Sequence, residues 1–127
     1  MQKSFYPLIE NPYREKDIIE GIKILKSKKL TIGSKTDEFQ KIFSKKLKTK
    51  YSIMVNSGSS ANLLALQCLI NPYRKKRLNP GDEVLIPSLC WSTSLWPIIQ
   101  SGLSPKFVDV DLDSLNINLD DLKKKKI

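Results

Sequence analysis

An apolar segment, a turn of small residues and a second apolar segment follow one another between residues 51 and 69. Ser52–Val55 has the length and composition of a short buried strand, and Ala61–Leu69 is rich in strong helix formers. The turn between them, Asn56–Ser60, has the sequence NSGSS and carries no bulky side chain beyond Asn56. A strand that runs directly into a helix is a unit of α/β folds, so this order of elements restricts the fold class strongly.

The same turn predicts a binding site for phosphate. A helix begins with backbone N–H groups that have no partner within the helix, and the helix dipole adds positive potential at that end. Ser57-Gly58-Ser59-Ser60 is not a Walker loop, because no Gly-Lys-Ser/Thr follows, and it lacks the further glycines of a dinucleotide-binding fingerprint. The sequence leaves open the alternative of a tight turn in which the small residues serve only packing.

Two helices are predicted ahead of this strand and turn. Apolar residues recur at helical spacing along Asp17–Lys29, and Thr31-Ile32-Gly33 ends that pattern. Ser34 is predicted to cap a second helix, with Asp37 at its third position as the partner in a capping box. Four apolar side chains are predicted to form the buried face of the second helix: Phe39, Ile42, Phe43 and Leu47.

Further strands are predicted at Glu83–Ile86 and Lys106–Val110, with a helix at Trp91–Gln100 between them. Asn79-Pro80-Gly81-Asp82 is a strong turn signal ahead of the first of these strands. Three strands that alternate with helices are typical of a parallel sheet with helices on its faces. The predicted fold class is therefore α/β.

The last predicted helix is short. Asn118 is its predicted N-cap, with Asp121 at the third position, and the sequence ends about two turns later. Three parallel strands also leave at least one bare sheet edge. We therefore expect residues 1–127 to be the front part of a larger domain, with amino-terminal helices in residues 1–50 and the start of the α/β sheet in residues 51–127.

A second group of residues lies at the predicted carboxyl end of the middle strand, where open α/β sheets bind ligands. Pro87–Ser94 has the sequence PSLCWSTS, and its Trp91 would share a sheet edge with the phosphate turn. An indole beside a phosphate site suits an aromatic cofactor that carries a phosphate, although a tryptophan at a strand end is also typical of a core. Trp96 has no such position and is predicted to lie in the core or an interface.

Asp109 and Asp111 stand two residues apart in the third predicted strand and would share one of its faces. Paired carboxylates can carry out acid–base chemistry. Hydrogen bonds that cap the neighbouring loop are an equally good explanation, and the sequence leaves both open.

The formal net charge of +9 at pH 7 suggests an anionic partner, but the composition argues against nucleic acid. Arginine occurs only as Arg14, Arg74 and Arg77, and the many lysines are scattered rather than interleaved with aromatic residues. We therefore expect no nucleic-acid partner. A positive field would suit a phosphorylated cofactor and an anionic substrate.

The chain contains no histidine, which excludes Ser-His or Cys-His catalysis and histidine metal sites within it. Cys68 and Cys90 match no metal-ligand spacing and are predicted to be free thiols. No segment approaches the roughly 20 apolar residues of a membrane span, and the polar first residues do not resemble a signal peptide. We predict a cytoplasmic protein with no membrane partner.

In order along the chain, six segments resemble the DegT/StrS family of enzymes, which use pyridoxal 5′-phosphate (PLP) and act on nucleotide-linked keto sugars. They are LTIG, DEFQKIF, YSIMVNSGSSANLLAL, NPGDEVLIPSLCWSTS, WPIIQSGLSPKFVDVD and SLNINLDDL. The specificity comes from the ordered set, which covers nearly the whole chain. Within the family, CWSTS followed by WPIIQSGL is most similar to the GDP-4-keto-6-deoxy-D-mannose 3-dehydratases.

The resemblance implies the amino-terminal part of the large domain of a fold type I PLP enzyme, in a homodimer with active sites at the subunit interface. Four residues match the positions that hold PLP or its amino form PMP: Gly58, Ser59, Ser60 and Trp91. The first three match the phosphate site, and the tryptophan matches the residue that stacks on the pyridine ring. Tyr6, Thr31 and Gly33 match a segment near the nucleotide-sugar substrate.

The family's aspartate that pairs with the pyridinium nitrogen matches no position in this chain. The same holds for its Schiff-base lysine, which is a histidine in the 3-dehydratases. The resemblance therefore implies that the catalytic residues and the carboxy-terminal domain lie beyond residue 127. Lys123–Lys126 are no substitute, because they lie on the last predicted helix. We predict that residues 1–127 alone bind PLP poorly and catalyse nothing.

For the intact enzyme, the resemblance favours 3-dehydration of a GDP-4-keto-6-deoxyhexose, in the biosynthesis of deoxysugars for surface polysaccharide. Transamination of a nucleotide-linked keto sugar with glutamate as donor is the close alternative. A small basic binding protein without a cofactor is the alternative from another class.

Overall fold

A computed structural model describes residues 9–125, and helices and strands alternate along most of this range. The chain divides into two compact units, of which the first ends at Met54 and the second begins at Val55. Tyr6, one of the predicted substrate residues, lies outside the described residues.

The first unit holds helices α1 (Glu15–Ser27) and α2 (Ser34–Leu47). The backbone N–H of Arg14 donates to Oδ2 of Asp17 at 3.0 Å, which caps α1. The predicted cap of α2 is wrong by one residue, because Gly33 is the N-cap and Ser34 is already helical. The N–H of Asp37 donates to the carbonyl of Gly33 at 3.1 Å, so Asp37 occupies the fourth helical position and forms no capping box.

The apolar face predicted to bury α2 is exposed, which corrects the prediction. Phe39 is 44% exposed and Phe43 is 41% exposed, and their rings stack with centroids 5.4 Å apart. Ile42 and Leu47 are exposed as well. The physical reason is that α1, the other helix of the first unit, makes no extensive contact with α2 among the described residues.

The strand predicted at Ser52–Val55 is absent from the structure. A strand needs a neighbouring strand to pair with, and in the described residues this segment is instead tied to α2 by Gln40. The hydroxyl of Ser52 donates to the carbonyl of Gln40 at 2.6 Å, and the N–H of Met54 donates to its side-chain oxygen at 2.8 Å. The sheet described here therefore has two strands rather than three.

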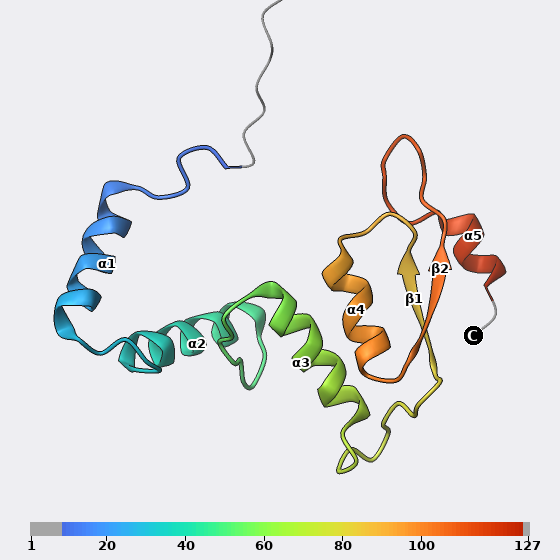
Figure 1. Ribbon diagram of the computed structural model, residues 1–127, viewed down its shortest axis with the longest axis horizontal. Helices are drawn as coiled ribbons and strands as arrows, with labels where there is room; N and C mark the ends of the chain where they lie inside the picture. Colours follow the sequence, from blue (N-terminus) through green and yellow to red (C-terminus); the bar gives the residue numbers. More distant parts are fainter. Residues whose placement is uncertain (1–8, 126–127) are drawn as a thin grey trace, which may run out of the picture. The chain divides into compact units, whose positions relative to one another are not determined.

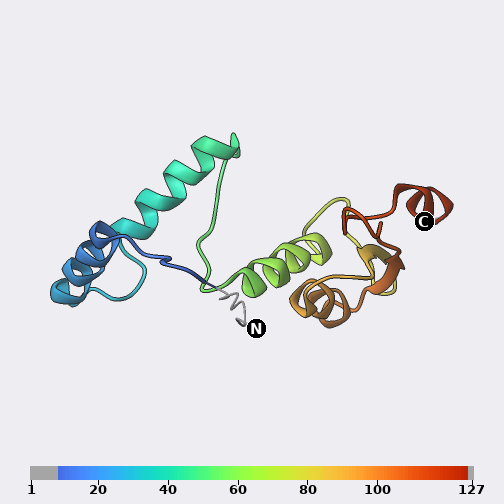
Figure 2. The same ribbon diagram turned by 90° about the horizontal axis from the view of Figure 1, so that it is seen from above.

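The second unit is a short α/β unit and confirms the predicted fold class. Its elements in order are α3 (Gly58–Ile70), β1 (Glu83–Pro87), α4 (Ser92–Gln100), β2 (Ser104–Val108) and α5 (Leu119–Lys124). The two strands are parallel, and their register runs from Glu83 opposite Ser104 to Pro87 opposite Val108. In Figure 1, α4 lies beside the strand pair and α3 beside α4; seen from above in Figure 2, α5 lies on the far side of β2 from α4.

β2 begins two residues earlier than the predicted Lys106–Val110. Gly102 ends α4 with φ of +71°, and the N–H of Ser104 already donates to the carbonyl of Asp82 at 2.9 Å, so pairing starts at once. At the other end, Val110 leaves the strand and forms an isolated antiparallel bridge with Ile117. The predicted turn at residues 79–82 is confirmed, with Gly81 at φ of +88° and the N–H of Asp82 bonded to the carbonyl of Asn79.

The core of the second unit lies between α4 and the strands. Ile86 of β1, Ile98 of α4 and Leu103 are buried and form one cluster. Leu66 and Ile70 of α3 pack against that cluster from the side. This packing holds α3 and α4 together beside the sheet, and both helices carry predicted site residues at their first turns.

Candidate functional site

The predicted phosphate turn forms the first turn of α3. Ser57 is the N-cap, and its hydroxyl oxygen accepts the backbone N–H of Ser60 at 3.1 Å. The N–H of Ala61 donates to the carbonyl of Ser57 at 3.0 Å. The helix therefore starts at Gly58, three residues before the predicted Ala61, because the serine cap lets the small residues join the helix.

Two backbone donors remain open at this end of α3. The N–H of Ser60 is taken by Ser57, whereas those of Gly58 and Ser59 have no partner among the described residues. The first turn holds no acidic residue, so nothing in it neutralises the positive end of the helix dipole. Ser59 is exposed and Ser60 is half-buried, which adds two hydroxyl groups beside the open amides.

Gly58 leaves the backbone of this turn accessible. A Cβ built at Gly58 would meet no atom within 4 Å, and the residue has no positive φ. Neither packing nor backbone strain therefore requires glycine here. A glycine also permits close approach of a ligand to the backbone.

Trp91 is the N-cap of α4, four residues after β1 ends. Its side chain forms no capping hydrogen bond, whereas Ser, Thr, Asp and Asn are the residues that ordinarily cap helices. The residue is 77% exposed, which excludes a core position in this unit. A large exposed indole that departs from the local capping preference is typical of a binding site.

A hollow of about 260 Å³ lies between the first turn of α3 and α4. Its lining residues come from these two helices: Ser59, Ser60, Leu63, Thr93, Trp96, Pro97 and Gln100. The structure thus brings the predicted phosphate residues Ser59 and Ser60 to the side of α4, and Trp91 stands at the N-terminus of that same helix.

Exposure of Trp96 excludes the core, the first of its two predicted positions, and its place in an interface stays a prediction. Trp96 is 54% exposed and lines the hollow, because Pro97 and Ile98 form the buried part of α4. Sequence reasoning also missed Thr93 and Gln100 as lining residues. Thr93 follows Trp91 by two residues and could have been found from that spacing, whereas Gln100 carries no local signal.

Thr31 and Gly33 lie in the loop between α1 and α2 of the first unit. Thr31 is exposed and Gly33 is half-buried. Their predicted place near a substrate stays a prediction, as does that of Tyr6.

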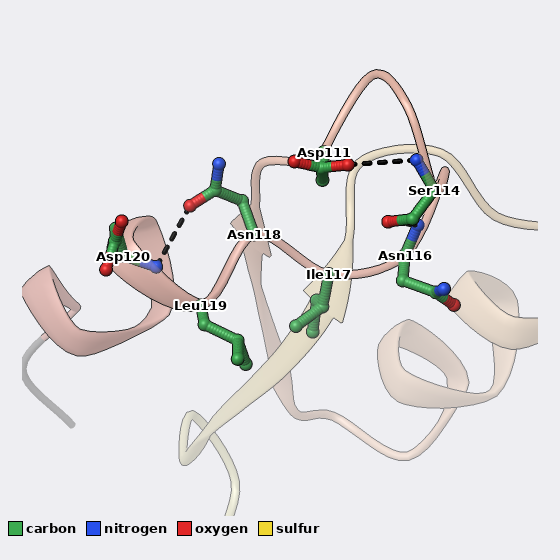
Figure 3. A pocket seen from close by; sticks show the side chains of 7 residues that line it. All are labelled: Asp111, Ser114, Asn116, Ile117, Asn118, Leu119 and Asp120. Carbon is green, nitrogen blue, oxygen red and sulfur yellow. Dashed lines mark hydrogen bonds between the residues drawn. The ribbon is translucent and has the colours of Figure 1, made fainter.

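A larger hollow, about 680 Å³, lies elsewhere, along the loop that joins β2 to α5 (Figure 3). Oδ1 of Asp111 accepts the backbone N–H groups of Ser114 at 2.9 Å and Asp113 at 3.1 Å. These bonds, led by the one from Ser114, lower the pKa of Asp111. Oδ1 of Asn118 accepts the N–H of Asp120 at 3.0 Å. Asp111 thus holds the loop, and Asn118 caps α5.

Asp109 and Asp111 do not share the face of a strand, which corrects that expectation. β2 ends at Val108, and both carboxylates lie in the loop beyond it. Oδ1 of Asp109 accepts the N–H of Val110 at 2.9 Å. Loop hydrogen bonds, the second of the two explanations left open by the sequence, account for both residues.

Within residues 9–125, no three His, Cys, Asp or Glu side chains group closely enough to hold a metal ion. Across the same part of the chain, no helix has the length and hydropathy needed to cross a membrane. Both cysteines are free thiols, as predicted, with Cys68 exposed and Cys90 half-buried.

The chain is similar to enzymes that act on nucleotide-linked sugars. GDP-4-keto-6-deoxy-D-mannose 3-dehydratase of Escherichia coli O55:H7 is 39% identical over 119 residues, which are 94% of this chain and 30% of that enzyme. UDP-4-amino-4-deoxy-L-arabinose–oxoglutarate aminotransferase of Shewanella sediminis is 30% identical over 115 residues, 91% of this chain and 28% of that enzyme.

A solved structure agrees with these sequence relationships. The E. coli GDP-4-keto-6-deoxy-D-mannose-3-dehydratase with bound hydrated PLP superposes with a TM-score of 0.87 at 37% identity, over 97% of this chain and 31% of that one. The chain thus spans about 30% of the length of the curated relatives it matches. The sequence profile of one family matches residues 12–126. The chain belongs to the DegT/DnrJ/EryC1/StrS aminotransferase family.

Proposed function

We propose that the first turn of α3 and Trp91 hold PLP or PMP. The observation that carries the proposal is the pair of open backbone N–H groups at Gly58 and Ser59, at an α-helix N-terminus without acidic residues. The hydroxyl groups of Ser59 and Ser60 would add donors to the phosphate. The exposed indole of Trp91 would stack on the pyridine ring.

The cofactor, when bound, supplies an electron sink for the reacting substrate. The residues of this chain would bind its phosphate, orient its ring and shield one face of it from water. In this proposal, the described side chains bind and orient the cofactor and transfer no proton. The residues that hold the pyridine nitrogen and move protons would come from other parts of the protein, so residues 1–127 alone should bind the cofactor poorly and catalyse nothing.

For the full-length protein we propose 3-dehydration of a GDP-linked 4-keto-6-deoxyhexose in the biosynthesis of deoxysugars. The higher identity to a 3-dehydratase than to an aminotransferase supports this choice, together with the CWSTS segment. Glutamate-dependent transamination of the same class of nucleotide sugar is the second candidate. A cytoplasmic homodimer, with Tyr6, Thr31 and Gly33 near the sugar, completes the proposal.

Product analysis of the full-length protein distinguishes the two reactions. The protein is incubated with GDP-4-keto-6-deoxymannose, PLP and glutamate, and the nucleotide sugars are analysed by mass spectrometry. Dehydration predicts a product that has lost the C3 oxygen and keeps the C4 ketone. An amino group at C4 would instead establish the aminotransferase. An unchanged sugar would contradict the proposed enzyme class.

The two tryptophans of the chain provide a matched test of the cofactor site. Pyridoxine 5′-phosphate is the probe, because it lacks the aldehyde that would react with surface lysines. The proposal predicts that the probe quenches tryptophan fluorescence in the unsubstituted full-length protein and in its Trp96→Phe variant. The Trp91→Phe variant should lose the quenching that comes from Trp91. Quenching that persists in Trp91→Phe and disappears in Trp96→Phe would reassign the stacking residue.

A further inference from the structure

Pro97 leaves one carbonyl of α4 without its ordinary helical partner. In an α-helix, each backbone N–H donates to the carbonyl four residues earlier, and proline has no N–H. An N–H at position 97 would donate to the carbonyl of Thr93. Because position 97 is a proline, the Thr93 carbonyl receives no such bond. A polar group that loses its helical partner must find another donor or water.

The missing donor comes from the neighbouring helix. Nδ2 of Asn62, on α3, donates to the carbonyl of Thr93 at 3.3 Å. Asn62 stands two residues after Ser60, and Thr93 stands two residues after Trp91. This hydrogen bond therefore joins the end of α3 that carries the open amides to the end of α4 that carries the exposed indole.

We propose that Asn62 is a positioning residue, whose amide replaces the donor that Pro97 lacks and thereby fixes the Gly58–Ser60 turn relative to Trp91. The inference rests on the proposed function, because it concerns the two halves of one cofactor site. The hollow between the helices supports it, since Ser59, Ser60, Thr93 and Pro97 all line that hollow. Asn62 acts through the backbone of α4 and not on the ligand itself.

The same helix pair supplies a matched control at its other end. Nε2 of Gln67 donates to the hydroxyl of Ser101 at 3.1 Å, and Ser101 is buried. Gln67 also joins α3 to the α4 side of the unit, but it does so away from Ser59 and Trp91. Loss of either amide removes one hydrogen bond between these helices, whereas only Asn62 lies beside the proposed site.

Two probes of different size separate a positioning role from a structural one. Inorganic phosphate needs only the first turn of α3, and pyridoxine 5′-phosphate needs that turn and Trp91 together. Two substitutions remove the amide in the full-length protein: Asn62→Ala, and Asn62→Leu, in which leucine is similar in size to asparagine. Each should weaken the binding of pyridoxine 5′-phosphate about fivefold, as expected for one lost hydrogen bond. The Asn62 variants should bind inorganic phosphate with an affinity within about twofold of that of the unsubstituted protein. Gln67→Ala should bind both probes within about twofold of the unsubstituted protein.

Equal losses for both probes in the Asn62 variants, or no loss for either, would overturn the positioning role while leaving the proposed site intact. Failure of the unsubstituted protein to bind either probe would overturn the proposed site and the positioning role together. These two failures are distinguishable, because the second is seen without any substitution.

A double-mutant cycle tests the hydrogen bond independently of any ligand. In the Pro97→Ala background, residue 97 regains an N–H and can donate to Thr93, so Asn62→Ala should lower the urea midpoint less than it does beside Pro97. Additive effects of Asn62→Ala and Pro97→Ala would show that the Asn62 amide does not replace the missing donor, and would overturn the inference.

Discussion

At Gly58, a substitution can change ligand binding without lowering the stability of the fold. Gly58 occupies the first position of α3, has an ordinary helical backbone and touches nothing that a methyl group would displace. Glycine lowers helix stability relative to alanine, so the chain accepts a small cost at this position. A bound group that approaches the backbone closely would explain why.

We predict that Gly58→Ala leaves the free energy of unfolding unchanged or raises it by up to about 1 kcal/mol. The added methyl group should weaken phosphate binding by about tenfold, close to the loss of one hydrogen bond to a charged group. Urea unfolding and phosphate titration of the full-length protein measure the two effects.

Gly21→Ala is the matched control, because Gly21 is also helical and a Cβ there would meet nothing within 4 Å. It should stabilise α1 to a similar extent without any change in phosphate affinity. A loss of affinity in both variants would show that the Gly58 effect is not local to the turn.

At the scale of elements, α3 combines an uncharged sequence with an exposed surface. Its residues are apolar on most sides, a pattern typical of helices in the interior of larger proteins. Leu66 packs on the core cluster, whereas Leu64 is 38% exposed. The exposed side of α3 is therefore available for contact with other protein surface.

We predict that residues 1–127 bind an apolar fluorescent dye and that Leu64→Lys reduces this binding. The same substitution should lower the free energy of unfolding by no more than the roughly 0.5 kcal/mol usual for surface substitutions. Leu66→Lys is the control and should destabilise the chain strongly, because it places a charge against the core. Equal destabilisation by the two substitutions would contradict the assigned orientation of α3.

α5 is tied to the end of β2 by one carboxylate. Oδ2 of Asp121 accepts the backbone N–H of Asp109 at 2.8 Å, and this bond is the main cause of the lowered pKa of Asp121. A carboxyl group with a lowered folded-state pKa stabilises the fold above its unfolded value, here near 3.8. The contribution is lost as the pH falls from that value through the folded-state pKa.

We therefore predict that the amide resonances of α5 and of Asp109 shift together as the pH is lowered below about 4. Asp121→Asn should remove that joint transition. Asp120→Asn is the control, because Asp120 is exposed and its carboxylate pairs only with Lys123 among the described residues. A joint transition that survives in Asp121→Asn would contradict the assignment.

For the whole molecule, local signals predicted most of the second unit. The Asn118 cap is confirmed, since its side chain accepts the N–H groups of Asp120 and Asp121, and the turn at residues 79–82 formed as expected. These features depend on a few adjacent residues. The α/β class followed from their order along the chain.

The failed predictions depend on partners distant in sequence. Ser52–Val55 has the composition of a strand, but strand pairing needs a neighbour that composition cannot identify. The face of α2 that includes Phe39 and Phe43 has helical spacing, yet spacing does not state what covers it. The sequence likewise did not predict that Gln100 lines the hollow between α3 and α4, because that depends on how the two helices pack.

The central claim is that the phosphate of a pyridine cofactor is held at the N-terminus of α3. The most direct measurement is calorimetric titration of the full-length protein with pyridoxine 5′-phosphate and, separately, with pyridoxine, which lacks the phosphate. The account predicts much tighter binding of the phosphorylated compound, by at least about tenfold, and competition from inorganic phosphate. Equal affinity for the two compounds, or no competition by phosphate, would contradict it.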